Sequence, residues 1–512
     1  MLERLNTTST VNVETFGAVG DGSTDDTTAI QSAFDYAKDS GGGLVQFTPG
    51  KTYAVSTFLV VYDNTTIYAY GATIKAIGNT GLLRNFVSTE AFNAYQGHSN
   101  ITVLGGVWDG NAFNGTDGSV TAETDVMNFI HASNVTLRDL TVQNTSTAHA
   151  VEFNSSQNCQ VLNCNFLGYK DNSSDQSRQF SEAVQLDIAV SGSSSIGAFD
   201  NTTAQNILVD GCYFGPSARC GKFGRAIGSH TLASGAYYYG IQITNNRIEG
   251  TIQEGIRGYG WRRVTIANNV INSTGLSGIC LTIPNPSGGY SANSRNISIT
   301  GNTIERPAAD SGIRVLGYSG ATVDQVVITG NSILGNAADT ANGIHVEYCS
   351  RPVVTGNTVY SMGSTGIYNN YSDGGSINGN TVRSSKSNGI NINQSTGTTV
   401  SGNNVDTTTT NHCIFVGSSN DFLITGNRTT NAAGAGIRLG ASATDGMVTN
   451  NRIIKGTSVN GITGDSTATG STVALNDLTG NGWSAATAVS LSGSATYTFS
   501  GGTTSPGDNL VS

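Results

Sequence analysis

The most constraining feature of the sequence is a repeat of about 23 or 24 residues that runs from about residue 205 to residue 465. Each copy contains a short apolar strand such as Ile297-Ser298-Ile299, then a Gly-Asn or Asn-Asn pair, and later a Gly-Ile step. A period of this length matches one coil of a parallel β-helix, because the helix pairs of α-helical solenoids need longer repeats. The repeated asparagine occurs at Asn246, Asn269, Asn302, Asn331, Asn357, Asn380, Asn403, Asn427 and Asn451.

The side-chain pattern of the repeat explains how such coils stack. Alternation within each strand sends one set of side chains inward, where equivalent residues of successive coils form a continuous core. We expect the repeated asparagine to be structural for two reasons. It tolerates the left-handed backbone of a tight corner, and its amide can hydrogen-bond from coil to coil. The sequence therefore predicts an all-β, single-stranded parallel β-helix.

Composition supports one long solenoid. The 512 residues include 66 glycines, only 7 prolines and 12% charged residues, which is typical of a turn-rich β protein. The regular placement of Ile and Val excludes a disordered chain. We expect residues 1–60 to form an N-terminal segment with a capping helix, residues 61–466 the β-helix, and residues 467–512 closing strands that could also support oligomerisation.

Charge and hydropathy exclude several classes of protein. A net charge of −10 and a pI near 5.0, without a Lys/Arg stripe, argue against a nucleic-acid partner. No run of 18 apolar residues exists and Met1–Thr10 lacks the apolar core of a signal peptide, so we expect a soluble chain without membrane insertion. The 7 cysteines are scattered and show no metal-type pairing, and neither a metal site nor a cofactor is expected.

The N-terminal segment differs from the repeats. Thr24–Phe34 has the pattern of an amphipathic helix with acidic residues at its start, and Gly41-Gly42-Gly43 ends it. A helix at this place can cover the open end of a solenoid, which would otherwise expose its core and an unpaired strand edge.

This opening also carries a family resemblance. The run from Phe16 to Asp26, the helix that follows it and Phe47-Thr48-Pro49-Gly50 resemble the start of the pectate-lyase superfamily. This superfamily of right-handed β-helices includes polygalacturonases, rhamnogalacturonases, alginate epimerases and phage tailspike depolymerases. The resemblance implies a right-handed parallel β-helix that acts on a polysaccharide, but it does not specify the reaction.

Three consecutive coils bring together most of the candidate catalytic groups. Aligned on their Gly/Ala-Ile/Val steps, they predict one inward column of Val184, Ile227 and Ile256, flanked by outward columns of polar residues. Adjacent coils lie roughly 4.8 Å apart, so the polar side chains should form one patch. The expected catalytic residues are Glu182, Asp187, Arg225, His230, Glu254 and Arg257, and the expected substrate-binding residues beside them are Gln185, Tyr259 and Trp261.

The patch permits more than one interpretation. Glu182 and Glu254, two coils apart, fall near the roughly 6.5–9.5 Å separation of inverting glycosidases, and Asp187 is an equally good partner for Glu182. The sequence does not assign acid and base. Alternatively, the patch is a solvated face on which Arg225 pairs with both glutamates.

A second group of polar residues lies further along the repeats. We expect Arg314, His345, Glu347 and Tyr368 to line a groove, because aromatic rings stack on sugars and arginines bind hydroxyls or acidic groups. They could equally be ordinary residues of a β surface.

No coil carries the paired aspartates with a following Gly-His-Gly and Arg-Ile-Lys that polygalacturonases show, and the Asp-Pro-His-Glu of alginate epimerases is absent. The Glu182–Asp187 and Ala226–His230 stretches look more like phage tailspike and appendage proteins. This resemblance implies a glycan depolymerase that hydrolyses a bacterial surface polysaccharide or a teichoic-acid-type polymer, as a homotrimer in a virion tail spike or as a secreted protein. The alternatives are a uronate lyase or C5-epimerase, and a receptor-binding spike without catalysis.

Overall fold

The computed structural model of the chain describes residues 9–113, 119–192, 194–286, 294–457, 460–478 and 489–491, and the backbone of β52 (Thr498–Phe499) and β53 (Leu510–Val511). The chain divides into two compact units. Unit 1 comprises residues 1–265 and 269–271, and unit 2 comprises residues 266–268 and 272–512. The boundary falls within β24 (Trp261–Ala267) and β25 (Val270–Thr274).

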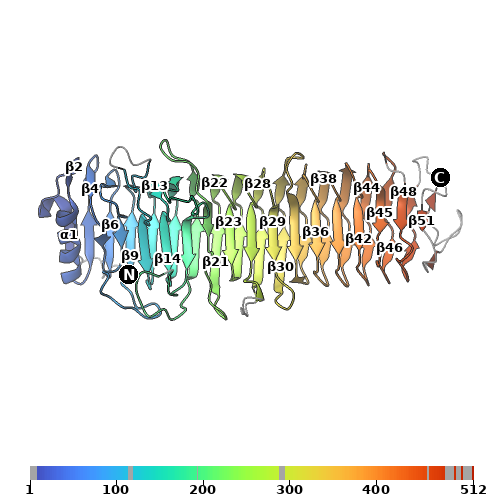
Figure 1. The fold of residues 1–512 in the computed structure, drawn as a ribbon, viewed down its shortest axis with the longest axis horizontal. Coiled ribbons are helices and arrows are strands. Elements are labelled where there is room, and N and C mark those ends of the chain that lie inside the picture. Colours follow the sequence, from blue (N-terminus) through green and yellow to red (C-terminus); the bar gives the residue numbers. More distant parts are fainter. Residues whose placement is uncertain are drawn as a thin grey trace. The chain divides into compact units, whose positions relative to one another are not determined.

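Unit 1 is built from three parallel sheets, and successive strands of the chain visit them in turn (Figure 1). Sheet A contains β1 (Ser9–Asn12), β3 (Gly43–Gln46), β6 (Thr65–Tyr68), β9 (Ile101–Leu104), β12 (Val135–Arg138), β15 (Gln157–Leu162), β18 (Gln205–Asp210) and β21 (Tyr238–Thr244). Sheet B contains β2 (Asp21–Asp25), β4 (Thr52–Val55), β7 (Thr73–Ala76), β10 (Val107–Asp109), β13 (Thr141–Ser146), β16 (Asn165–Lys170), β19 (Tyr213–Gly215) and β22 (Arg247–Thr251). Sheet C contains β5 (Leu59–Val60), β8 (Leu83–Arg84), β11 (Met127–Ile130), β14 (Val151–Asn154), β17 (Glu182–Asp187), β20 (Arg225–Gly228) and β23 (Ile256–Tyr259).

Unit 2 repeats the same arrangement. Its sheet A contains β27 (Arg295–Thr300), β30 (Val323–Thr329), β33 (Cys349–Ser350), β34 (Val353–Thr355), β37 (Ser376–Asn378), β40 (Thr399–Ser401), β43 (Leu423–Thr425), β46 (Met447–Thr449), β49 (Thr472–Ala474) and β52. Its sheet B contains β28 (Thr303–Glu305), β31 (Ser332–Leu334), β35 (Thr358–Tyr360), β38 (Thr381–Ser385), β41 (Asn404–Thr408), β44 (Arg428–Thr430), β47 (Arg452–Ile454), β50 (Asp477–Leu478) and β53. Its sheet C contains β26 (Ile279–Thr282), β29 (Ser311–Leu316), β32 (Asn342–Glu347), β36 (Ile367–Asn370), β39 (Ile390–Asn393), β42 (Ile414–Gly417), β45 (Ala435–Leu439), β48 (Asn460–Gly464) and β51 (Val489–Leu491).

This architecture is a right-handed parallel β-helix, which confirms the predicted fold class. The core column is also confirmed, because Val184 pairs with Ile227 and Ile227 with Ile256, all fully buried. Among the described residues, no helix combines the length and hydrophobicity that a membrane span requires. The three-part division at residues 60 and 466 stays a prediction, and much of its last part lies outside the described residues.

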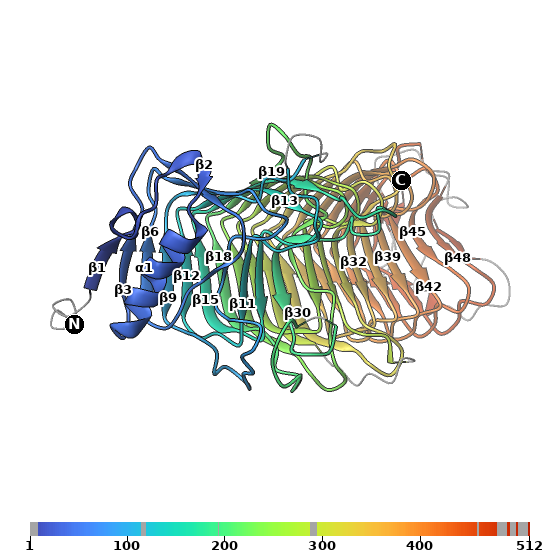
Figure 2. The same cartoon turned by 60° about the vertical axis from the view of Figure 1, so that its left-hand side comes forward.

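The N-terminal segment of unit 1 forms η2 (Val13–Phe16) and α1 (Thr27–Asp39). Helix α1 lies at the N-terminal end of unit 1, and Figure 2 shows it beside β3. It buries an apolar face of Ile30, Ala33, Phe34 and Ala37, because these positions recur at the spacing of one helical face. The predicted capping helix is therefore present.

The repeated asparagines form a buried ladder of side-chain amides. In unit 2, the Nδ2 atom of Asn331 donates to Oδ1 of Asn357 at 3.0 Å, and Asn357 donates in the same way to Asn380 at 3.0 Å. One part of the prediction was wrong: the left-handed residue is the one before each ladder asparagine, such as Gly330 (φ 64°) or Gly356 (φ 63°). The ladder asparagine contributes its amide, and the preceding residue makes the corner.

Asn357→Ala should lower the free energy of unfolding by roughly 3 kcal/mol, because the Asn331 amides lose their acceptor and the Ile328 carbonyl loses a buried donor. Chemical denaturation of the variant tests this. The control is Asn404→Ala on β41, a half-buried position outside the ladder, where a change within about 0.5 kcal/mol is expected. Equal losses in both variants would contradict a special role for the ladder.

Candidate functional site

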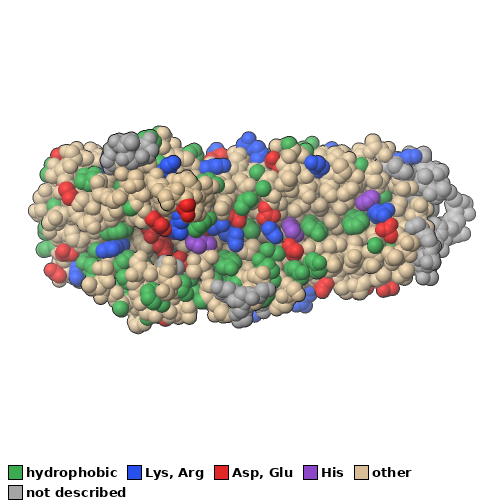
Figure 3. Space-filling model, in the orientation of Figure 1, with side chains coloured by type: hydrophobic (Ala, Val, Ile, Leu, Met, Phe, Trp, Pro, Cys, Tyr) green, Lys and Arg blue, Asp and Glu red, His purple; other side chains and the backbone are tan. Residues whose placement is uncertain are grey.

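A pocket of about 390 Å³ lies over sheet C of unit 1. On the face that Figure 3 shows, acidic, basic and histidine side chains gather in a hollow of this unit. The lining includes three of the predicted site residues, Gln185, Asp187 and His230. The other lining residues are Glu123, Thr124, Asp125, Ala148, His149, Glu152, Arg178, Gly192, Ser195 and Thr231.

The strand register positions the floor of the pocket. Asn128 on β11 pairs with Glu152 on β14, and Glu152 pairs with Gln185 on β17, so these three side chains form one outward column. The next outward position after Gln185 is Asp187, at the end of β17. Because the coils are in register, neighbours in this column are spaced by one strand separation, roughly 4.8 Å.

Asp187 is held as a neutral acid at the side of the pocket. Its Oδ2 accepts a hydrogen bond from Nε2 of Gln185 at 2.7 Å, and its Oδ1 accepts one from the Ile188 amide at 2.8 Å. The side chain is only 3% exposed. Burial raises the pKa of Asp187 to about 8, and the nearby carboxylates of Glu182 and Asp125 act in the same direction.

Asp125, His149 and Glu152 form a second cluster in the same pocket. Oδ1 of Asp125 lies 2.9 Å from Nδ1 of His149 and also accepts a hydrogen bond from the His149 amide at 3.0 Å. The amide of Asn128 donates to both carboxyl groups, to Asp125 Oδ2 at 2.8 Å and to Glu152 Oε2 at 2.7 Å. Asn128 therefore holds the two acids side by side.

The environment shifts the pKa values of the two acids of this cluster in opposite directions. Burial would raise the pKa of Asp125, but its hydrogen bond and charge interaction with His149 outweigh burial and lower the pKa. Burial and the charge of Asp125 raise the pKa of Glu152 well above its ordinary value. At neutral pH the pocket thus contains an ionised Asp125 beside a protonated Asp187.

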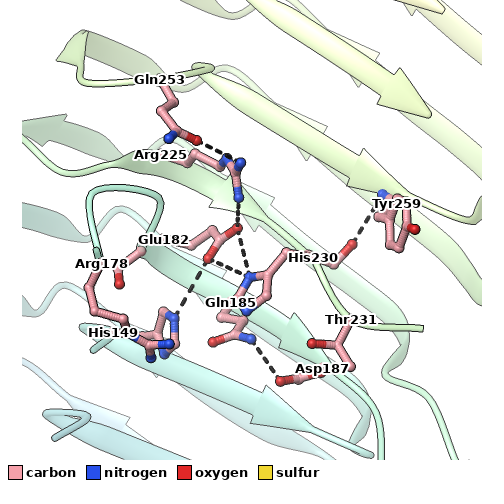
Figure 4. Close-up of polar contacts among 12 residues, drawn as sticks. His149, Arg178, Glu182, Gln185, Asp187, Arg225, His230, Thr231, Gln253 and Tyr259 are labelled. Atoms are coloured by element: carbon pink, nitrogen blue, oxygen red, sulfur yellow. Dashed lines mark hydrogen bonds and ion pairs between the residues drawn. The ribbon is translucent and has the colours of Figure 1, made fainter. Parts of the chain in front are cut away.

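Glu182 lies beneath the pocket and does not line it. It is 0% exposed, and its carboxylate contacts Arg225 Nη1 at 3.0 Å, His230 Nδ1 at 3.1 Å and His149 Nε2 at 3.6 Å (Figure 4). Burial would raise the pKa of Glu182, but its interactions with His230 and Arg225 outweigh burial and lower the pKa to about 2. Glu182 is therefore a fixed anion that positions the two histidines.

This burial corrects the expectation that Glu182 and Glu254 face solvent with room for a water between them. Arg225 occupies the space instead, because its Nε contacts Glu254 Oε2 at 2.7 Å while its Nη1 contacts Glu182. Glu254 is 4% exposed and also pairs with Arg257 at 3.1 Å. The alternative in which Arg225 pairs with both glutamates describes the contacts correctly, but the network is buried rather than solvated.

Trp261 was wrongly placed at the edge of the patch. It is 1% exposed, and its indole Nε1 donates to Oγ of Ser229 at 2.7 Å, so its ring packs inside the unit. Tyr259 is half-buried, and the Arg257 guanidinium lies 5.6 Å from its ring centre. Neither Tyr259 nor Arg257 lines the pocket.

Sequence reasoning missed Asp125, His149, Glu152 and Arg178. A signal for Glu152 was available, since Val151–Asn154 aligns with Val184–Asp187 one coil later and puts Glu152 in the Gln185 column. Asp125 and Arg178 lie outside the strands, on segments whose path the repeat does not specify. Arg178 pairs with Glu123 at 2.5 Å on the wall of the pocket.

Asp125, His149 and Glu152 are also the group that could hold a metal ion, since one ligand atom from each lies within 4.8 Å of the others. Asp125 Oδ1 and His149 Nδ1 already engage each other, and Glu152 Oε2 accepts a hydrogen bond from Asn128. The expectation of a metal-free site stays a prediction.

The remaining predicted residues lie together on sheet C of unit 2. Arg314, His345, Tyr368 and Asn391 pair in sequence across four strands, and we call them the unit 2 column. The His345 and Tyr368 rings stack with centres 4.7 Å apart, and Arg314 Nη1 contacts Asp310 at 3.0 Å. Glu347 lies beside the column, with its Oε2 3.5 Å from His345 Nε2.

Asp187→Asn should become more stable relative to wild type as the pH rises. The folded-state pKa of about 8 lies above the ordinary value of 3.8, so unfolding releases a proton between these pH values. The wild-type contribution of this group is therefore fully present below about pH 4 and is lost as the pH rises through about 8. The amide variant has no such group. Its melting temperature, minus that of wild type, should increase from about pH 5 to about pH 9.

The comparison variant is Glu182→Gln, which leaves Arg225 without one of its buried partners and should destabilise the protein by roughly 3 kcal/mol at neutral pH. A constant difference between wild type and Asp187→Asn over the whole pH range would contradict the protonated state of Asp187.

Sequence relatives of the chain include three with names that describe an activity or a binding partner. The plasmin and fibronectin-binding protein A of Streptococcus pneumoniae is 29% identical over 280 residues, covering 51% of this chain and 38% of the relative. A capsule-specific depolymerase of Klebsiella phage K64-1 is 25% identical over 295 residues, covering 53% and 31%. Alginate lyase 7 of Azotobacter vinelandii is 38% identical over 126 residues, covering 21% and 13%. The matched part is thus well under two thirds of each relative.

Solved structures share the fold. The S. pneumoniae surface protein and adhesin PfbA superposes with a TM-score of 0.57 and 21% identity, covering 84% of this chain and 99% of that one. A tailspike protein of E. coli bacteriophage HK620 gives a TM-score of 0.52 and 14% identity, covering 84% and 78%.

Two family models match different parts of the chain. The model described as periplasmic copper-binding protein (NosD) matches residues 282–488. The model described as rhamnogalacturonase A/epimerase, pectate lyase-like, matches residues 10–280, which is more than half of the chain and includes the whole pocket. The chain therefore belongs to the rhamnogalacturonase A/epimerase family of pectate lyase-like β-helix proteins.

Proposed function

We propose that the unit 1 pocket is the active site of a glycan depolymerase that hydrolyses a bacterial surface polysaccharide or a teichoic-acid-type polymer. The observation that carries the proposal is the pair of protonation states on one pocket surface, a neutral Asp187 and an ionised Asp125. Carboxyl groups whose environments separate their pKa values are the arrangement that acid–base cleavage of a glycosidic bond requires.

Each acid has a defined role in the proposed reaction. Asp187 donates its proton to the glycosidic oxygen as the bond from that oxygen to the anomeric carbon breaks. Asp125 accepts a proton from the water that attacks the anomeric carbon, and His149 holds the Asp125 carboxylate in place. Glu152 lines the pocket beside these acids and can hydrogen-bond a sugar hydroxyl. The products are two shorter glycans, one with a new reducing end.

The names of the relatives support a polysaccharide substrate, since one is a capsule-specific depolymerase and another an alginate lyase. As part of the same proposal, the protein forms a homotrimer and is located in a virion tail spike or outside the cell. The oligomeric state and the location rest on the resemblance to tailspikes.

A uronate lyase or C5-epimerase is the second candidate. The pocket that contains the acids is also lined by His149, His230 and Arg178. A lyase needs a cation to neutralise the uronate carboxylate and a base to remove the C5 proton, and these side chains include both types. The third candidate is a binding protein without turnover, because the pneumococcal relative is named for binding plasmin and fibronectin.

Asp187→Asn and Asp125→Asn should each lower the rate of depolymerisation by about 10²-fold or more, because each removes one proton-transfer group. Wild-type activity should fall as the pH rises through about 8, where Asp187 loses its proton. Digestion of purified capsules and wall polymers, followed by reducing-end assay and mass spectrometry, measures both effects.

The matched control is Asp139→Asn, an exposed aspartate of unit 1 outside the pocket, which should retain the wild-type rate. Products that absorb as unsaturated uronates would identify a lyase. Inversion at C5 without cleavage of the polymer would identify an epimerase. Undiminished turnover in both pocket variants would reject the site.

We also propose that the unit 2 column binds glycan away from the bond that is cleaved. Stacked aromatic rings beside arginine and amide groups suit sugar rings and their hydroxyls. Nε of Arg314, Nε2 of His345 and Oδ1 of Asn391 are buried without a hydrogen-bond partner, although His345 Nε2 does lie 3.5 Å from Glu347. Three neighbouring groups with unused hydrogen-bonding capacity are what a polar ligand would satisfy.

Tyr368→Ala should raise KM for long oligosaccharides by roughly 5- to 10-fold and change the rate on the shortest cleavable substrate little, because remote contacts contribute uniform binding. Steady-state kinetics on oligomers of graded length test this. Tyr360→Ala, at an exposed position on β35 of sheet B, is the control. Loss of rate on long and short substrates alike would place Tyr368 at the chemistry.

A further inference from the structure

Arg84 extends the polar column of the pocket by one coil toward the N-terminus. It lies on β8 and pairs with Asn128 on β11, which in turn pairs with Glu152 on β14. Arg84 is therefore two strand separations, roughly 10 Å, from Glu152 along the outward column of sheet C. It does not line the pocket itself.

The guanidinium of Arg84 lies over two aromatic rings. Its central carbon lies 5.0 Å from the ring centre of Phe58 and 5.0 Å from that of Phe86. Stacking of this kind fixes the plane of the guanidinium while its N–H groups remain free to donate at the edge. The side chain is half-buried, so this edge is accessible from one side.

Arg84 has no anionic partner in the part of the chain that the structure describes. It forms no ion pair or hydrogen bond there, and its Nε is buried without an acceptor. The nearby carboxylate of Glu90 is already engaged by His98 at 3.0 Å and by the Val87 amide at 2.8 Å.

Other arginines of unit 1 are placed differently. Arg178, Arg225 and Arg257 each contact a carboxylate within 3.1 Å. The carboxylates around Arg225 raise its pKa, whereas burial outweighs the charge of the nearby Glu90 and lowers the pKa of Arg84. A half-buried, stacked and unpaired guanidinium is an unfavourable arrangement unless a ligand supplies the anion.

We propose that Arg84 binds an anionic group of the substrate, a carboxylate or a phosphate, on a sugar about three units away from the bond that is cleaved. The planar fork of an arginine matches either oxyanion through two parallel hydrogen bonds. This inference rests on the proposed function for the location of the cleaved bond, and it adds that the polymer is acidic.

The column between Arg84 and Asp187 supplies the rest of a binding track. Oδ1 of Asn128 and Oε1 of Gln185 are both buried without a hydrogen-bond partner, while the nitrogen of each amide is engaged by carboxylates. These two acceptors flank Glu152 along the column. A glycan that lies along this column places one substituent at Arg84 and a glycosidic oxygen near Asp187.

An acidic glycan is compatible with the acidic pocket. Of the pocket carboxyls, Asp187 is protonated, Glu152 has a raised pKa, Asp125 is bound to His149, and Glu123 is paired with Arg178. Because the chain carries a net charge of −10, an anionic polymer needs a local cation to bind.

The test measures binding separately from turnover. Full-length protein with Asp187→Asn is run in native gels that contain polygalacturonate, alginate, a glycerol-phosphate teichoic acid or neutral dextran. We expect retardation by at least one acidic polymer and none by dextran. Adding Arg84→Met, which keeps an unbranched apolar side chain against the rings, should weaken the retardation about 10-fold or more. Polygalacturonate and alginate carry carboxylates and the teichoic acid carries phosphates, so a comparison of their retardation shows which of the two anions Arg84 binds.

Two further variants make the result specific. Arg138→Met removes an exposed arginine of β12 and should leave retardation unchanged. Arg84→Lys keeps the charge but not the planar fork, and should recover only part of the affinity. If Arg84 were merely structural, Arg84→Met would lower the melting temperature and leave affinity for acidic polymers as it was.

The outcomes separate this inference from the proposed function. Hydrolysis of a neutral polymer, at a rate that Arg84→Met does not change, would overturn the inference and leave the depolymerase intact. Retention of an acidic polymer through Arg84 by a wild-type protein that never cleaves it would support the inference and overturn the depolymerase. Absence of retardation by every acidic polymer would also overturn the inference.

Discussion

The in-register stacking of coils is the constraint on which the rest of this structure depends. Each strand satisfies its backbone groups with the coils before and after it, so a residue at a given position repeats in space at every coil. The asparagine ladder fixes this register at one corner, because each buried amide finds its acceptor on the next asparagine. A slip of one residue would break the ladder and turn core side chains toward solvent.

The same register determines the chemistry of the pocket. Asn128, Glu152 and Gln185 come from segments far apart in sequence, yet pairing between β11, β14 and β17 places them in one line. Acids brought together so closely beneath covering segments cannot all remain ionised. The neighbours of each acid then decide its state: His149 keeps Asp125 ionised, whereas Asp187 has only neutral donors in hydrogen-bond contact and keeps its proton.

The sequence predicted what depends on periodicity and missed what depends on the segments between the strands. The fold, the capping helix, the asparagine ladder and the column of Val184, Ile227 and Ile256 all follow from spacing. The burial of Glu182 does not follow from spacing. The position of a residue in the repeat predicts whether its side chain points into or out of the coil, but it does not predict which segments cover an outward side chain. Asp125 joins the pocket from outside the strands and has no repeat to reveal it.

The state of Asp187 bears on whether this protein catalyses a reaction or only binds a ligand. Binding a sugar through hydrogen bonds needs no buried acid with a pKa near 8, since an amide at the same place would make similar contacts without a pH-dependent loss of stability. A proton held ready beside an ionised carboxylate is useful when a bond must be broken. The unit 2 column, by contrast, combines stacked rings, an amide and an ion-paired arginine, which suits binding alone. This difference in chemistry favours turnover in unit 1 and recognition in unit 2.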